Sequence, residues 1–82
     1  SEGIFLLYSG EEARLVFHDR PEVVSLLPMS EVCEGIDIEG VRWPLRDVVL
    51  ERRFPWAISN EAVGDSVTAR CREGVCAVYW RR

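Results

Sequence analysis

Cys71 and Cys76 are the two residues whose type and spacing most directly permit chemistry. Glu73-Gly74 between them predicts a tight turn, and the resulting hairpin sets the cysteines opposite each other, one pair beyond that turn. Cα atoms at such a non-hydrogen-bonded pair are about 4.5 Å apart, within the range of about 4.4–6.8 Å that a disulfide needs. We expect both side chains on the buried face of a C-terminal hairpin. The bond itself stays open, but the lack of a visible export leader and the unpaired Cys33 favour reduced thiols.

His18 is the only histidine and lies beside Asp19, an arrangement that general base catalysis can use. The rest of a catalytic site is missing, because no nucleophile elbow, Gly-rich phosphate loop or isolated carboxylate pair accompanies it. A zinc site of His18 with the three cysteines can be written, but its spacing matches no standard zinc motif. We therefore expect a surface histidine, no metal and no cofactor, and we favour a protein without catalytic activity of its own.

All ten basic residues are arginines, whose forked guanidinium groups bind phosphate and carboxylate. The same composition results from codon usage in a GC-rich, bacterial genome. Residues 1–41 carry a net charge of −7 and residues 42–82 one of +3, so the total of −4 conceals a polarised chain. Such polarity can orient a charged partner, although two unrelated solvated faces would produce the same pattern.

The predicted C-terminal hairpin places arginines and one aromatic ring on its polar face and at its end. These residues are Arg70, Arg72, Tyr79, Arg81 and Arg82. Guanidinium groups bind phosphates and a ring stacks on a base, so this face is an alternative site for nucleic acid. The isoelectric point near 4.9 argues against tight non-specific binding, and nucleic acid ranks below a protein as the expected partner.

Three tryptophans are a large aromatic content for a chain of 82 residues. Trp43 and Trp80 fall on the apolar faces of predicted hairpins and are expected in the core. Trp56 follows a proline that interrupts the alternation, and Arg52 and Arg53 precede it. Trp and Arg are favoured anchors of protein interfaces, so these three residues form the predicted partner-binding site.

The elements that position these residues are mostly strands, because apolar and polar residues alternate along much of the chain. Residues 4–8 and 13–18 predict a first hairpin with a Gly-containing loop. Glu39-Gly40 as a two-residue turn predicts a second hairpin over residues 36–43, because that register puts all the apolar side chains on one face. Residues 44–54 predict a single turn followed by a strand.

One short helix is predicted near residues 20–27. Asp19 is followed three residues later by Glu22, a pattern that is frequent at helix N-termini. Apolar residues then recur at helical spacing, at Val23, Leu26 and Leu27.

A chain of 82 residues with 48% apolar and 29% charged residues is typical of one small domain, here residues 1–82. We predict an α+β or mainly β fold, a small twisted antiparallel sheet or barrel of hairpins with one short helix. No apolar run approaches the ~20 residues that cross a bilayer, so we expect a cytoplasmic protein without a membrane partner. The leading interpretation is a non-enzymatic binding or regulatory module that acts through protein–protein contact. Nucleic-acid binding and a small thiol-based redox enzyme or sensor are the alternatives.

Overall fold

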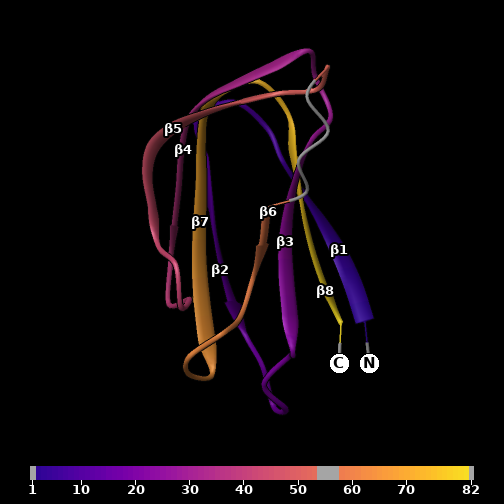
Figure 1. The fold of residues 1–82 in the computed structure, drawn as a ribbon, viewed down its shortest axis with the longest axis vertical. Helices are drawn as coiled ribbons and strands as arrows, with labels where there is room; N and C mark the ends of the chain where they lie inside the picture. The colour runs from indigo at the N-terminus through magenta and orange to yellow at the C-terminus, as the bar shows by residue number, and fades with distance from the viewer. Residues whose placement is uncertain (1, 54–57, 82) are drawn as a thin grey trace.

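The computed structural model describes residues 2–53 and 58–81, and the secondary structure of these ranges consists of eight strands (Figure 1). The strands are β1 (Glu2–Leu7), β2 (Glu11–Val16), β3 (Val23–Pro28), β4 (Val32–Glu39), β5 (Leu45–Glu51), β6 (Ile58–Asn60), β7 (Ser66–Glu73) and β8 (Cys76–Arg81). Within the described ranges there is no helix, and hence none long and apolar enough to span a membrane.

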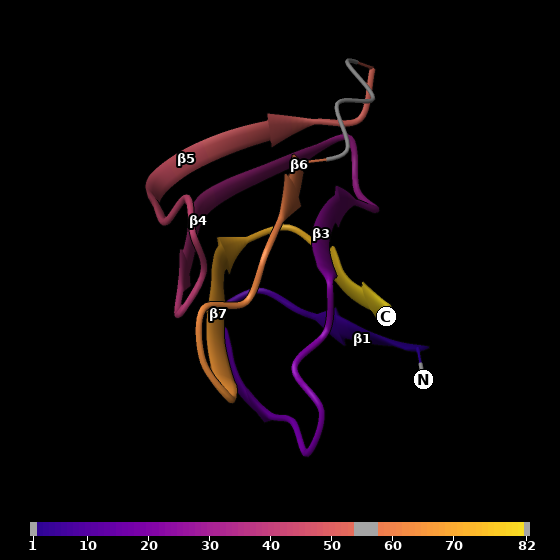
Figure 2. The same cartoon turned by 60° about the horizontal axis from the view of Figure 1, so that its bottom comes forward.

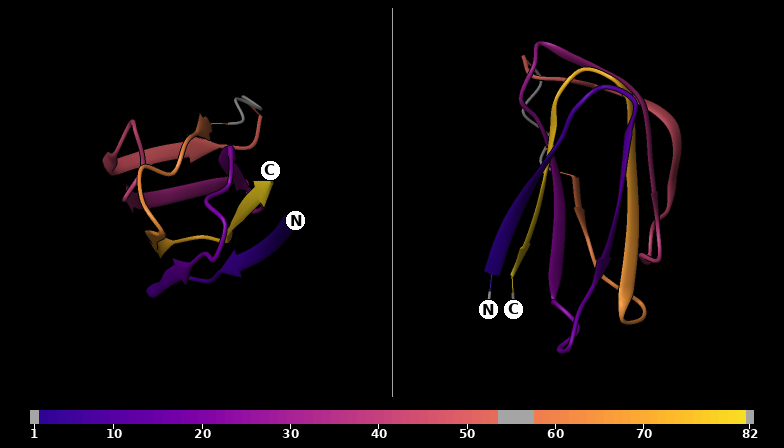
Figure 3. Two further views of the ribbon diagram at one scale, coloured as in Figure 1. Left: turned by 90° about the horizontal axis from the view of Figure 1, so that it is seen from below. Right: turned by 180° about the vertical axis from the view of Figure 1, so that it is seen from behind.

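The strands form two four-stranded antiparallel sheets that pack against each other (Figure 2). Sheet A has the strand order β1-β8-β3-β6, and sheet B has the order β2-β7-β4-β5. Every connection between consecutive strands crosses from one sheet to the other, except the connection from β4 to β5. This arrangement is that of an eight-stranded jelly roll. The chain termini lie side by side, because Glu2 of β1 pairs with Arg81 of β8 (Figure 3).

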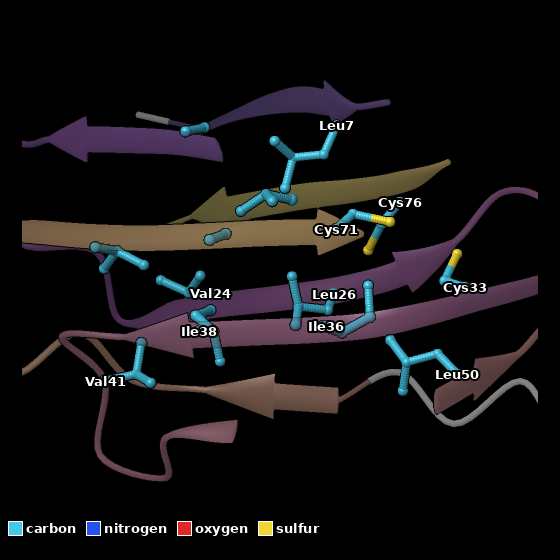
Figure 4. Close-up of a cluster of buried hydrophobic side chains, with 14 of the residues drawn as sticks. Leu7, Val24, Leu26, Cys33, Ile36, Ile38, Val41, Leu50, Cys71 and Cys76 are labelled. Atoms are coloured by element: carbon cyan, nitrogen blue, oxygen red, sulfur yellow. The ribbon is translucent and has the colours of Figure 1, made fainter. Parts of the chain in front are cut away.

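The core lies between the sheets and is built from inward-pointing side chains of both sheets (Figure 4). Fully buried side chains there include Leu7, Val24, Leu26, Ile36, Ile38, Val67 and Val78. Burying one side chain of this kind contributes about 1.5–3 kcal/mol, so this core is the main source of stability. Figure 4 shows Cys33, Cys71 and Cys76 at one end of the core and Val41 at the opposite end.

The predicted C-terminal hairpin is wrong, although both of its strands exist. Cys71 pairs with residues of β2 and β4 in sheet B, whereas Cys76 pairs with residues of β1 and β3 in sheet A. Both side chains are fully buried, as predicted. Two strands that face one core from opposite sheets show the same alternation as two strands of a hairpin, so the sequence pattern does not separate the two cases.

The first predicted hairpin is wrong for the same reason, and the second has a different register from the one predicted. β1 pairs with β8, and β2 pairs with β7. Ile38 pairs with Leu45 across the β4–β5 connection, where the prediction had paired it with Val41. The strand predicted within residues 44–54 is present as β5, and it begins at Leu45 without the preceding turn.

The predicted helix at residues 20–27 is also wrong, because this segment contains β3. β3 lies between β8 and β6, and the consecutive side chains of Val24, Ser25 and Leu26 are all buried. A short apolar run that is covered on both sides has no clear period of two, so its pattern is easily mistaken for that of a helix. The fold is therefore mainly β, with two antiparallel sheets that do not close into a barrel.

Candidate functional site

The connection between β4 and β5 forms a short ladder with the segment that follows β6. Val41 and Ala62 make an antiparallel bridge, and both side chains are buried. The N–H group of Arg42 donates a hydrogen bond of 2.8 Å to the carbonyl oxygen of Glu61. Paired backbone therefore supports this end of the sandwich, which positions the neighbouring side chains.

Gly40 is required where this ladder begins. Its φ angle is 82°, in the left-handed region that favours glycine. A Cβ atom at this position would also collide with the carbonyl oxygen of Ser66. The carbonyl oxygen of Gly40 accepts a hydrogen bond of 3.1 Å from Val63, so the chain turns out of sheet B and into the ladder at this residue.

The side chain of Asn60 extends the ladder by one more pair. Asn60 is 3% exposed, and its amide nitrogen donates a hydrogen bond of 2.7 Å to the carbonyl oxygen of Trp43. Its Oδ1 atom accepts bonds of 3.0 Å from the N–H groups of Trp43 and Glu61. We call this set of three bonds the Asn60 clamp. Because Asn60 belongs to sheet A and Trp43 to a connection of sheet B, the clamp ties the two sheets together.

Trp43 is held at its backbone, but its side chain is 53% exposed, so the prediction that it lies in the core is wrong. Trp80, in contrast, packs against the core as predicted and meets Phe17 edge to face at 5.7 Å between ring centroids. The difference arises because Trp43 leaves the strand register at the ladder, whereas Trp80 stays within β8.

The exposed indole of Trp43 contacts Arg42, and Arg42 in turn pairs with Glu61. The guanidinium carbon of Arg42 is 4.9 Å from the ring centroid, a cation–π distance. Nη1 of Arg42 is also 3.3 Å from Oε2 of Glu61. The arrangement thus combines an aromatic face, a carboxylate and a cation on a rigid support.

Glu61 also lines an open groove of about 620 Å³ beside this cluster. The groove lies between the segment that leads into β3 and the segment after β6; its other lining residues are Arg20, Pro21, Glu22, Val23, Ala62 and Val63. The groove is open to solvent and combines three charged side chains with apolar ones. An aromatic face beside carboxylates is suited to a ring that carries positive charge.

The residues of the nucleic-acid hypothesis are not brought together. Arg70 and Arg72 lie on β7 in sheet B, whereas Tyr79 and Arg81 lie on β8 in sheet A. The hydroxyl group of Tyr79 donates a hydrogen bond of 2.8 Å to Glu2. Arg82 lies outside the described residues.

Carboxylates already engage the two arginines of β7. Arg70 contacts Glu12 at 2.6 Å and Asp37 at 4.0 Å, and the hydrogen bond to Glu12 raises the pKa of Arg70. Arg72 lies 3.4 Å from Asp47. This surface of sheet B is thus covered by ion pairs of opposite charge and offers no continuous basic stripe.

The predicted partner site at Trp56, Arg52 and Arg53 stays a prediction. Trp56 lies outside the described residues. The guanidinium group of Arg52 donates a hydrogen bond of 3.3 Å to the carbonyl oxygen of Met29, and Nε of Arg53 lies 3.8 Å from Glu51.

Cys33, Cys71 and Cys76 are free thiols, and all three are fully buried. Burial raises the pKa of Cys76 to about 12 and also raises that of Cys71. Because the thiolate is the reactive and metal-binding form, these side chains are poorly suited to redox or metal chemistry. In residues 2–53 and 58–81, no set of three or more Cys, His, Asp or Glu is arranged to hold a metal ion, and His18 is exposed.

Sequence reasoning missed the three residues that build the site, Arg42, Asn60 and Glu61. Asn60 lies in a stretch rich in Ser, Asn, Gly and Asp, a composition that favours turns, although it is the last residue of β6. The contact between Trp43 and Asn60 spans 17 positions, and no periodicity links them. Only the three-dimensional ladder reveals this contact.

The fold and the site define a jelly-roll β-sandwich domain with an aromatic, charged surface beside a groove. The family model described as "Thiamin pyrophosphokinase, vitamin B1 binding domain" matches residues 14–76, which include the entire site. Because this match covers most of the chain, the chain belongs to this family. No protein of curated function matches it.

Solved structures share this fold over nearly the whole chain. Thiamin pyrophosphokinase from Geobacillus thermodenitrificans has a TM-score of 0.86 over 99% of this chain at 22% identity. Thiamine pyrophosphokinase from Bacillus subtilis has a TM-score of 0.82 over 98% at 19% identity. A thiamin pyrophosphokinase family protein from Enterococcus faecalis has a TM-score of 0.79 over 99% at 15% identity. The present chain spans 37% of the length of each.

Membership of this family corrects the functional interpretation drawn from the sequence. A non-enzymatic or regulatory module that acts through protein–protein contact is wrong, because the matching family is a domain of an enzyme family. The nucleic-acid and thiol-based alternatives are overturned by the same finding. The absence of a catalytic constellation from the sequence does not distinguish a protein-binding module from one domain of an enzyme.

Proposed function

We propose that residues 1–82 form the thiamin-binding domain of a longer thiamin pyrophosphokinase and that thiamin binds at Trp43 and Glu61. The observation that carries this proposal is the exposed indole of Trp43, which the buried Asn60 clamp supports and which Arg42 links to the Glu61 carboxylate. Thiamin joins an aromatic aminopyrimidine to a thiazolium ring that carries a permanent positive charge. An exposed indole face and a carboxylate are the groups that recognise such a cation.

The proposed division of labour follows from the size of the chain. It spans 37% of the solved thiamin pyrophosphokinases that it resembles. We therefore assign to this domain the orientation of thiamin, with its hydroxyl group free to accept the pyrophosphoryl group. Binding of the donor and stabilisation of the transferred group belong to the rest of the longer protein. The cytoplasmic location expected from the sequence is part of the same proposal.

The test is a calorimetric titration of the chain with thiamin. Trp43→Ala is expected to weaken binding about tenfold, because it removes the aromatic face from the cation. Glu61→Gln removes the negative charge and is expected to weaken binding by a similar factor. The neutral hydroxyethylthiazole half of thiamin should bind more weakly than thiamin and should be insensitive to Glu61→Gln.

Two matched variants serve as controls. Tyr8 is also 53% exposed but follows β1 at the cysteine end, so Tyr8→Ala removes an equally exposed ring away from the site. Glu39 forms an exposed ion pair with Arg46, so Glu39→Gln removes a comparable carboxylate. Thiamin affinity should survive both changes. Absence of thiamin binding, or equal losses in the site variants and their controls, would refute the proposed site.

A further inference from the structure

Arg42 contacts both groups that the proposed site offers to a cation, the Trp43 ring and the Glu61 carboxylate. Its guanidinium group lies 4.9 Å from the centroid of the Trp43 ring and 3.3 Å from the Glu61 carboxylate. These contacts are the ones assigned above to the thiazolium ring of thiamin. The free site therefore already contains a positively charged, planar group that belongs to the chain itself.

We propose that Arg42 is a resident cation that thiamin must displace, an inference that rests on the proposed function. When the thiazolium ring approaches Trp43 and Glu61, the guanidinium group leaves the carboxylate and moves into solvent. Binding is then an exchange of one cation for another, with no net change in the number of charges paired to Glu61.

The exposure of the ion pair makes this exchange feasible. The side chains of Arg42 and Glu61 are 62% and 51% exposed, so water can solvate both groups as they separate. Exposed ion pairs and exposed cation–π contacts are individually weak. The backbone N–H group of Arg42 stays bound to Glu61 in the ladder, so the side chain can move without opening the fold.

Two measurable consequences follow from this competition. Removing the guanidinium group should tighten thiamin binding by roughly three- to tenfold, the factor that the lost contacts represent. It should also make thiamin affinity more sensitive to salt, because an unpaired Glu61 then meets the ligand without a prior partner.

The experiment compares thiamin titrations of Arg42→Gln and Arg46→Gln at low and high salt. Arg46 is the matched control, because its exposed ion pair of 3.0 Å is with Glu39 rather than with Glu61. Both changes remove one positive charge from the chain. Tighter, more salt-sensitive binding in Arg42→Gln than in Arg46→Gln is the expected result.

The outcomes separate the two proposals. Unchanged or weaker thiamin binding in Arg42→Gln, with loss in Trp43→Ala and Glu61→Gln, would overturn the resident cation and leave the thiamin site standing. Equally tighter thiamin binding in both arginine variants would show that the change in net charge causes the effect. That result would also overturn the proposal that Arg42 is a resident cation. If Trp43→Ala and Glu61→Gln bind thiamin as the unchanged chain does, the proposed function itself fails.

A direct readout follows the guanidinium group in the unchanged chain. The Nε–H resonance of Arg42 should move on thiamin addition toward the position of a solvated arginine, while that of Arg46 stays in place. Arg42→Lys keeps the charge but lacks the planar fork, so its thiamin affinity should lie between those of the unchanged chain and Arg42→Gln. An Arg42 resonance that stays in place at saturating thiamin would contradict the exchange.

Discussion

The two ends of the core show how environment decides which polar residues serve a site. At one end, the Asn60 clamp satisfies a buried amide and supports the exposed ring of Trp43, which contacts Arg42. At the other end, three thiols are buried beneath the connection from β7 to β8 (Figure 4). The sequence drew attention to the thiols, but the structure favours the clamp as the functional end.

Polar side chains stabilise the cysteine end as well, where they hydrogen-bond to the connection from β7 to β8. The hydroxyl group of Ser30 accepts a hydrogen bond of 3.0 Å from Val75 and donates one of 2.8 Å to Val32. The thiol of Cys33 donates to the carbonyl oxygen of Val75 at 3.0 Å. These bonds close the connection over the thiols. The comparison teaches that a residue's reactive type matters less than whether its surroundings expose it.

The largest effect is expected at the clamp. Asn60→Ala should lower the free energy of unfolding by about 2–3 kcal/mol, because backbone groups of Trp43 and Glu61 lose their partner. Urea unfolding measures this change. Ser59→Ala, at the exposed neighbouring position, is the control and should change stability by less than ~0.5 kcal/mol. A loss at Asn60 no larger than that of the control would show that the clamp does not hold this end.

A smaller effect is expected at the other end. Ser30→Ala should lower the free energy of unfolding by about 1 kcal/mol, because it removes the hydrogen bonds of a partly buried hydroxyl group to Val32, Cys33 and Val75. Labelling of the native thiols by a disulfide reagent should become faster as the connection loosens. If labelling in the variant still occurs only through global unfolding, the closure of this end does not depend on Ser30.

The sequence predicts which residues are buried in the core better than it predicts which strands pair. Alternation correctly placed Val67, Cys71 and Val78 in the core, because burial of one strand face is a local property. It could not show which sheet each strand joins, because strands of both sheets face the same core. The Asn60 clamp joins Asn60 to Trp43, 17 positions away, through a side chain that takes the place of a peptide group. Local propensity does not predict such a contact.

The smallest effect is a pH dependence confined to the alkaline range. Burial raises the pKa of Cys76 from its ordinary value of 9.0 to about 12, so the folded state keeps a proton that the unfolded state loses. The contribution of this thiol to stability is complete below its ordinary pKa and is lost as pH rises toward 12. Urea unfolding across this range should show a decline that is shallower in Cys76→Ala. An equally steep decline in the variant would assign the alkaline loss to other groups.

The central claim is that thiamin binds at the clamp end rather than elsewhere on the sandwich. Nuclear magnetic resonance of the ¹⁵N-labelled chain during a thiamin titration tests it directly. We expect saturable shifts of the Trp43 indole N–H, the Asn60 side-chain amide and the Glu61 backbone N–H. Resonances of Cys71, Cys76 and Tyr8 at the opposite end should stay in place. Shifts that gather at the cysteine end, or no saturable shift at the clamp, would contradict the account.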